Sequence, residues 1–153
     1  MADKAVTRTI GIAAPPAAVW RALTTPELVG AWMWPESPLA VASDWTVGSP
    51  ITLSGVWHGH PYTDKGIILR CVPERALSYT RWSRFDRVPD APENYAVVAF
   101  ELAEEDGATR LTVTHSKLAS DEAAGHAGFF WYGALRRLRD QVERGADRPR
   151  DRG

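Results

Sequence analysis

The order of the element types along the chain constrains its fold more than any other feature. Residues 7–12 alternate like a strand, and residues 16–32 hold two short helical segments. Strand-like segments then fill the middle of the chain, and residues 123–144 have the apolar spacing of one long helix. This order predicts an α+β domain, in which a curved antiparallel sheet of about six or seven strands wraps on the terminal helix and two short helices follow the first strand.

Prolines and capping residues indicate where the helices begin. Pro16 is expected to open the first short helix, because proline costs little in a first helical turn. Thr25 is expected to cap the second short helix, and Asp121 the terminal helix. Residues 145–153 are mostly charged, so we expect a disordered tail after a single domain that covers residues 1–144.

Length and composition narrow the class of protein. The chain has 153 residues and a formal net charge of −1, which predicts no nucleic-acid partner and no anionic membrane partner. Cys71 is the only cysteine, so no internal disulfide can form, as is typical of a reducing compartment. No stretch reaches the roughly 20 apolar residues of a membrane span, and the N-terminus has no apolar signal core. We therefore expect a cytoplasmic protein.

Phosphate-binding and paired-cysteine motifs are absent from the sequence, and no cofactor or metal is indicated.

Aromatic residues are unusually frequent, with seven tryptophans in the chain. A sheet gripped by a helix forms a container, and aromatic side chains inside it favour a small-molecule pocket. The candidate ligand-binding residues are Trp32, Trp57, Tyr62, Tyr79, Trp82, Tyr95, Trp131, Ala134 and Leu135. Trp57 is expected on the strand face that looks into the cavity, whereas Trp82 lies near a loop and could rim an entrance. The alternative is that these aromatic residues are ordinary core residues.

His115 and Arg81 are the candidate catalytic residues. Leu111, Val113 and His115 alternate, which places the imidazole on the inner face of its strand beneath the terminal helix. Histidine titrates near neutral pH and can act as an acid or a base, but a polar residue hydrogen-bonded under the helix is the alternative. Arg81 either points outward or points inward, where it requires a carboxylate partner from Asp64, Glu101 or the ligand.

The pair His58 and His60 raises the question of a metal site. Two histidines two residues apart share one face of a regular strand and can bind zinc, provided that Asp64 or His115 supplies a third ligand. Gly59 and Pro61 indicate a turn instead, and in a turn the shared face is lost. We therefore expect solvent-exposed turn histidines and no metal site.

Several stretches together resemble a known superfamily. They are residues 12–32, residues 66–77, residues 109–115, and the helical spacing of Trp131, Leu135 and Leu138. In order and spacing the chain resembles the START-like (Bet v 1-like, SRPBCC) helix-grip superfamily from about Val6 to Arg144. Within that superfamily it is most similar to the single-domain proteins that resemble the C-terminal domain of the activator of Hsp90 ATPase. Many relatives have an aromatic residue where this chain has Arg81.

The resemblance implies three functions of different classes, because the superfamily includes lipid and hormone binders, polyketide cyclases and co-chaperone domains. The first hypothesis is that the chain binds a hydrophobic or aromatic small molecule between the sheet and the terminal helix. The second is a cyclase-like, aromatase-like or other small-molecule enzyme that uses the same cavity. The third and weakest is binding of an Hsp90-type partner. The sequence leaves the oligomeric state open, with a homodimer as one candidate.

Overall fold

Seven antiparallel strands form one curved sheet in the order β1-β7-β6-β5-β4-β3-β2. The computed structural model describes residues 4–37 and 39–147. The strands are β1 (Lys4–Ile12), β2 (Ala40–Ala42), β3 (Pro50–Trp57), β4 (His60–Val72), β5 (Ala76–Arg81), β6 (Ala96–Glu105) and β7 (Ala108–Leu118). The helices are α1 (Pro16–Thr24), α2 (Pro26–Met33) and α3 (Asp121–Asp147), with single 3-10 turns at η1 (Arg84–Asp86) and η2 (Pro92–Asn94). The predicted α+β helix-grip fold is confirmed.

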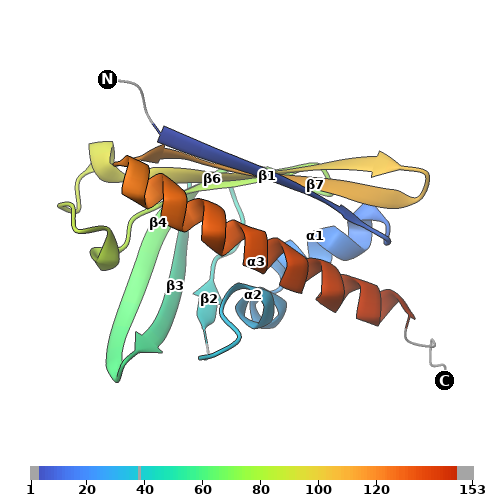
Figure 1. Cartoon of the computed structure of the whole chain (residues 1–153), viewed down its shortest axis with the longest axis horizontal. Coiled ribbons are helices and arrows are strands. Elements are labelled where there is room, and N and C mark those ends of the chain that lie inside the picture. Colours follow the sequence, from blue (N-terminus) through green and yellow to red (C-terminus); the bar gives the residue numbers. More distant parts are fainter. Residues whose placement is uncertain (1–3, 38, 148–153) are drawn as a thin grey trace.

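Helix α3 crosses one face of the sheet from end to end (Figure 1). Its apolar stripe is buried and consists of Trp131, Leu135, Leu138 and Val142. Polar contacts fix both ends of the helix: Lys4 Nζ lies 3.0 Å from Asp121 Oδ1, and the backbone N–H of Ala13 donates to Glu143 Oε2 at 2.8 Å. The position of α3 over the sheet is thus set by packing along its length, by β1 at one end and by Ala13, which directly follows β1, towards the other. Among the described residues, α3 and the shorter helices all fall short of the length and apolar character that a membrane span requires.

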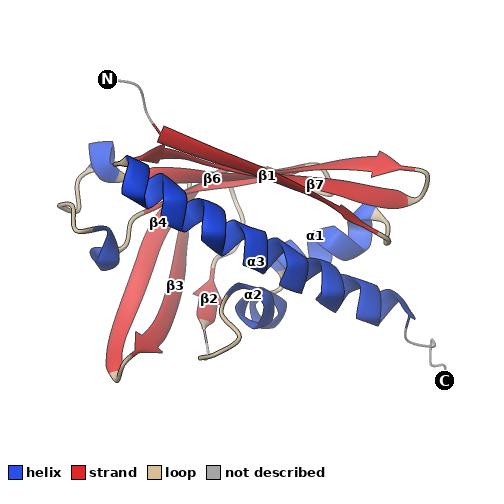
Figure 2. Cartoon of the chain, in the orientation of Figure 1, coloured by secondary structure: helices blue, strands red, loops and turns tan. Residues whose placement is uncertain are grey.

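The two short helices pack against the second half of α3 (Figure 2). Pro16 and Pro26 occupy the first positions of α1 and α2, as expected from their fixed backbone angle. Helix α3 donates to carbonyls of α2: Arg137 Nε donates to the Trp32 carbonyl at the end of α2 at 2.8 Å, and Gln141 Nε2 donates to the Leu28 carbonyl in its first turn at 3.2 Å. These contacts close one end of the grip.

The helix caps and the tail differ from the sequence predictions. Thr25 precedes α2 but makes no capping hydrogen bond with its side chain. Ser120, not Asp121, caps α3, because its hydroxyl accepts from the Ala123 N–H at 3.0 Å while the Asp121 carboxylate pairs with Lys4. Helix α3 also continues to Asp147, so the first residues of the expected tail are helical; residues 148–153 lie outside the described residues.

Strands β3 and β4 extend away from the rest of the sheet as a hairpin, which we call the arm (residues 50–66; Figure 1). Its turn consists of His58 and Gly59, both with positive φ, as in a two-residue hairpin turn. The other end of the arm is at Gly66, where a Cβ atom would lie only 1.6 Å from the Thr80 carbonyl oxygen. Glycine at this position lets β4 pass over β5 closely, so that one strand can pair with β3 in the arm and with β5 in the main sheet.

Candidate functional site

The space beneath the middle of α3 is filled by aromatic side chains. Trp131 lies against Phe100 at a ring-centroid distance of 5.5 Å and against Trp32 at 6.3 Å. All three side chains are buried, and so are the helix residues Ala134 and Leu135. Five of the candidate ligand-binding residues therefore belong to the hydrophobic core, in the place where the sequence predicted a cavity: Trp32, Tyr79, Trp131, Ala134 and Leu135.

Two surface hollows lie beside α3, away from this core. One has a volume of about 220 Å³ and lies between α2 and α3, lined by Trp32, Pro35, Arg137 and their neighbours. The other has about 120 Å³ and lies between β1 and α3. Both are smaller than the roughly 300–1,000 Å³ of an ordinary ligand pocket. In the larger hollow, Arg137 already donates to the carbonyls of α2, whereas Gln141 Oε1 is buried and has no hydrogen-bond partner among the described residues.

His115 lies on the inner face of the sheet, as its alternation with Leu111 and Val113 predicted. Its Nδ1 atom accepts a hydrogen bond of 3.1 Å from the indole Nε1–H of Trp131. Because Nδ1 is the acceptor, the proton of the neutral imidazole resides on Nε2. Burial, and to a smaller extent the charge of Arg81, lowers the pKa of His115 to about 4. The imidazole is therefore neutral at pH 7 and hydrogen-bonded under the helix, and a catalytic role for it stays a prediction.

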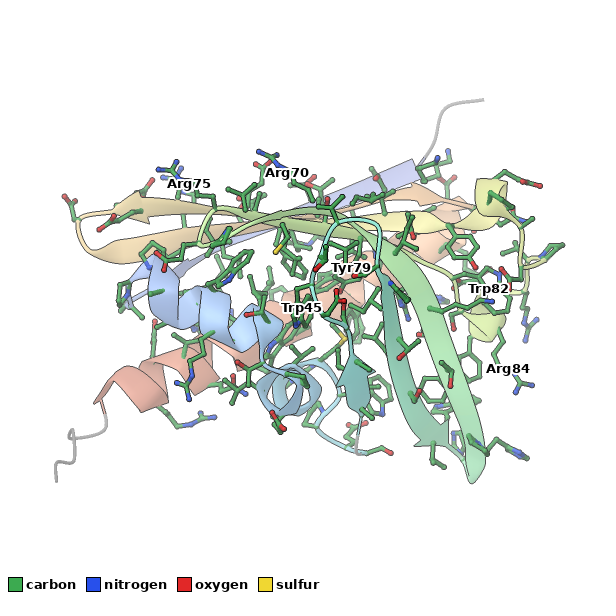
Figure 3. The ribbon with its side chains drawn as sticks, turned by 180° about the vertical axis from the view of Figure 1, so that it is seen from behind. Trp45, Arg70, Arg75, Tyr79, Trp82 and Arg84 are labelled. Atoms are coloured by element: carbon green, nitrogen blue, oxygen red, sulfur yellow. The ribbon has the colours of Figure 1, made fainter. Side chains whose placement is uncertain are left out.

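Tyr79 lies on the same face of the sheet as His115. The register pairs His115 with Val98 and Val98 with Tyr79, so the two side chains share one row across three strands. Figure 3 shows Tyr79 on the inner side of the sheet, whereas Arg70 and Arg75 project from the other face. Burial raises the pKa of Tyr79 to about 12, so its hydroxyl remains protonated and polar within the core.

Arg81 and Asp64 form an ion pair, here called the polar pair, next to this row. Arg81 Nη2 donates to Asp64 Oδ2 at 2.7 Å, so the predicted carboxylate partner of an inward Arg81 is Asp64. The Asp64 side chain is 6% exposed and that of Arg81 is 33% exposed. Asp86 in η1 also lies within electrostatic reach of Arg81, and its own burial raises the pKa of its carboxyl group. The pair thus has one nearly buried member and one that reaches solvent.

Three aromatic side chains, here called the aromatic trio, extend the polar pair outward along the arm. The ring of Phe85 lies 5.2 Å from the ring of Trp57 and 5.2 Å from the ring of Tyr62, both in edge-to-face geometry. Trp57 is 47% exposed and Phe85 is 46% exposed. Tyr62 lies across Gly55, where a Cβ atom would come within 2.8 Å of the phenol oxygen. Glycine on β3 therefore makes room for this ring.

Phe85 is the member of the aromatic trio that sequence reasoning missed. It lies in η1, in the connection between β5 and β6. Its position follows from a capping box, in which the Ser83 hydroxyl accepts from the Phe85 N–H and Asp86 Oδ2 accepts from the Ser83 N–H. The Ser83-x-x-Asp86 spacing was the signal that could have identified an ordered turn here, with its aromatic residue held against the arm.

Trp82 and Tyr95 lie away from the polar pair. Trp82 forms a backbone β-bridge with Lys65, whose side chain lies on the face of β4 opposite to that of Asp64. The Trp82 indole donates to the Val88 carbonyl at 3.1 Å. The Tyr95 hydroxyl donates to Asp90 at 2.6 Å, and Asp90 also pairs with Lys65. These two aromatic residues therefore anchor the loop between β5 and β6, while the polar pair faces inward.

The two histidines of the HxH pair occupy different positions at the tip of the arm. His58 is in the turn with φ 50°, and its ring contacts Trp57 at 4.2 Å, whereas His60 is the first residue of β4. Among residues 4–37 and 39–147, no three His, Cys, Asp or Glu side chains gather in a way that could hold a metal ion. The turn that the sequence indicated at Gly59 thus starts one residue earlier and leaves His60 in the strand.

Comparison with known proteins identifies the family. The family model described as activator of Hsp90 ATPase homolog 1-like protein matches residues 13–143, which is most of the chain. The chain belongs to this family. A separate comparison with curated proteins found no match.

Solved structures share the fold of this activator of Hsp90 ATPase homolog 1-like chain over nearly its whole length. ChR145 from Cytophaga hutchinsonii is 30% identical with a TM-score of 0.81, covering 97% of this chain and 99% of that one. CV1439 from Chromobacterium violaceum is 21% identical with a TM-score of 0.79, covering 91% and 96%. The Aha1 protein from Colwellia psychrerythraea, whose solution structure is a dimer, is 21% identical with a TM-score of 0.71, covering 93% and 98%. The last two similarities establish the fold alone.

Proposed function

We propose that this protein binds a small aromatic or hydrophobic molecule on the inner face of the arm. The observation that carries the proposal is the aromatic trio, which is exposed to solvent beside a nearly buried ion pair. Trp57 and Phe85 keep nearly half of their surface exposed after these edge-to-face contacts, so part of each ring is available to a planar ligand. The START-like fold commonly binds hydrophobic ligands, which agrees with this proposal.

The position of the site follows from what is already packed. Trp32, Phe100 and Trp131 occupy the middle of the grip, and opening a cavity there would require breaking the core. The arm needs no such rearrangement, because Trp57 and Phe85 already expose nearly half of their surface. A ligand on the arm would remove this apolar surface from water, and burial of about 100 Å² of apolar area is worth roughly 2.5 kcal/mol.

A matched pair of variants tests the proposal. Trp57 lies on the inner face of β3, and its neighbour Val56 is a comparably exposed apolar residue on the other face. Naphthalene-type compounds are titrated into each variant by isothermal titration calorimetry. We expect Trp57→Ala to weaken binding at least about tenfold, because stacking of a planar ring on an aromatic side chain is worth about 1–3 kcal/mol. We expect Val56→Ala to leave the affinity unchanged. Equal affinities of both variants and the parent protein would place the ligand elsewhere.

An enzymatic role is the alternative, and one observation bears on it. His115 keeps Nε2–H on the inner face of the sheet, where it could hydrogen-bond a substrate, but its pKa of about 4 leaves little of the protonated form at pH 7. Positioning by Arg81 and the tyrosines is then the main contribution available. If turnover of a ligand is found, His115→Asn should reduce the rate at least about 100-fold for a true acid or base, and by much less for a structural residue.

Self-association is a second proposal, favoured by the outer side of α3. Phe129 is 83% exposed there, with Tyr132 one turn further along. Phe129 and Tyr132 lie three residues apart on one side of the helix, and contiguous exposed apolar surface marks interaction sites. The Colwellia relative is described as a dimer. We therefore propose that a second copy of the chain covers this surface. Sedimentation velocity should find a dimer for the parent protein and a monomer for Phe129→Ser, and a monomeric parent protein would refute it.

A further inference from the structure

One oxygen of the polar pair has no partner. Asp64 Oδ2 accepts from Arg81, but Oδ1 is buried and has no hydrogen-bond partner within the described part of the chain. A carboxylate oxygen can accept two hydrogen bonds, and a buried one left without any is unfavourable. The Asp64 side chain is more than nine-tenths buried, so bulk water does not satisfy this oxygen directly.

Arg81 does not compensate for the free oxygen. Only its Nη2 donates to Asp64, so the pair lacks the two parallel hydrogen bonds of a bidentate arginine–carboxylate pair. The guanidinium also interacts electrostatically with the carboxylate of Asp86 in η1. Arg81 is therefore shared between two carboxylates, and Asp64 Oδ1 is left open to another donor.

The surroundings of Asp64 connect this oxygen to the aromatic trio. Tyr62 precedes Asp64 by two residues on the same face of β4, and the Asp64 charge contributes, after burial, to the raised pKa of the Tyr62 phenol. Across the strand pair, Asp64 faces Leu53, which is buried and apolar. A planar molecule seated on the aromatic trio would thus have its edge beside the Asp64 carboxylate.

We propose that Asp64 Oδ1 accepts a hydrogen bond from a hydroxyl group of the aromatic ligand, so that the site selects phenol-type molecules over the same rings without a hydroxyl. This inference rests on the proposed function of the arm. A neutral donor fits better than a cation, because bringing an ammonium group into this nearly buried site costs desolvation energy that a hydroxyl group largely avoids. Tyr62 is half-buried and Arg81 one-third exposed, so these two side chains can move aside to admit the hydroxyl to the covered oxygen.

Such a site would distinguish ligands by whether they satisfy the hydrogen-bonding capacity of Asp64 Oδ1. A ligand without a donor would still bury its rings but would keep Asp64 Oδ1 unsatisfied, whereas a hydroxyl would satisfy it with a hydrogen bond to a charged acceptor. We expect at least about a tenfold preference, since hydrogen bonds to charged groups are the stronger kind. Ring size and shape should matter less, because the aromatic trio is open on one side.

Naphthol and its methyl ether, methoxynaphthalene, test the inference. The two share the ring system, but only naphthol can donate a hydrogen bond. Isothermal titration calorimetry measures both with the parent protein, with Asp64→Asn and with Glu101→Gln, a matched loss of one exposed carboxylate on the other face of the sheet. We expect naphthol to bind at least about tenfold more tightly to the parent protein and to Glu101→Gln, and the preference to shrink severalfold in Asp64→Asn.

The outcomes separate the two proposals. Binding of neither compound would overturn the proposed function of the arm and this inference with it. Equal binding of both compounds to the parent protein would overturn the inference alone, and so would a preference that survives unchanged in a folded Asp64→Asn variant. If that variant does not fold, the ratio of the two affinities in the parent protein decides the matter by itself.

Discussion

The buried imidazole of His115 should make the stability of this protein depend on pH between about 6.5 and 4. In the unfolded chain the histidine titrates at its ordinary value of 6.5, and in the folded protein burial lowers its pKa to about 4. Between these values the unfolded state binds a proton that the folded state does not, so the free energy of unfolding falls as the pH falls. The stabilisation is complete above pH 6.5 and is lost as the pH decreases through this window.

The size of the effect follows from the two pKa values. At 1.36 kcal/mol for each pKa unit, a decrease from 6.5 to about 4 corresponds to about 3 kcal/mol of unfolding free energy. Asp86 acts in the opposite direction, because burial raises its pKa and favours the protonated folded state at low pH. A comparison with a variant that lacks only the imidazole removes such other contributions.

His115→Asn is the appropriate variant, because the asparagine oxygen can take the place of Nδ1 and accept from the Trp131 indole. Urea unfolding followed by circular dichroism gives the unfolding free energy of both proteins between pH 8 and pH 4. We expect the variant to be less stable than the parent protein at pH 8, because the packing of the imidazole ring is lost. Between pH 8 and pH 4, the unfolding free energy of the parent protein should fall by about 3 kcal/mol more than that of the variant. His126→Asn, which removes an exposed histidine, should follow the parent profile. Parallel profiles for the parent protein and His115→Asn would refute the reasoning.

Three further substitutions have expected effects on stability, each measured by urea unfolding. Gly66→Ala should cost about 3 kcal/mol or more, because its Cβ atom would meet the Thr80 carbonyl at 1.6 Å, whereas Gly11→Ala has open space and should be tolerated. Trp32→Ala should cost about 3–5 kcal/mol, since it empties the centre of the core. Ser120→Ala should cost about 1 kcal/mol and speed amide exchange in the first turn of α3; no change would mean that its hydroxyl is not the cap.

The helices and the inward row of residues were predictable because they depend on local chemistry. Pro16 and Pro26 begin their helices in the structure, as the fixed backbone angle of proline favours. The alternation that placed His115 on the inner face holds along β7, since strand periodicity needs no knowledge of distant residues. The choice of Asp64 as the partner of Arg81 could be narrowed to three candidates, and only the pairing of β4 with β5 decided among them.

The features that could not be predicted depend on packing between distant segments. Trp131 has the helical spacing of a residue that faces the sheet, but the sequence could not indicate that Trp32 and Phe100 fill the space in front of it. The directions in which Trp82 and Tyr95 point depend on the bend of β4 and on the ion pair between Lys65 and Asp90. Both features connect segments that are far apart in the chain.

The most direct test of the account is where a planar ligand perturbs the protein. The indole N–H signals of the tryptophans can be followed separately by two-dimensional proton–nitrogen NMR during a titration with naphthol. If the arm is the binding site, the signal of the exposed Trp57 should shift most, while those of Trp32 and Trp131, buried in the core, remain nearly unchanged. Large shifts of Trp32 and Trp131 with a stationary Trp57 would contradict the account, because they would place the ligand beneath α3 in the middle of the grip.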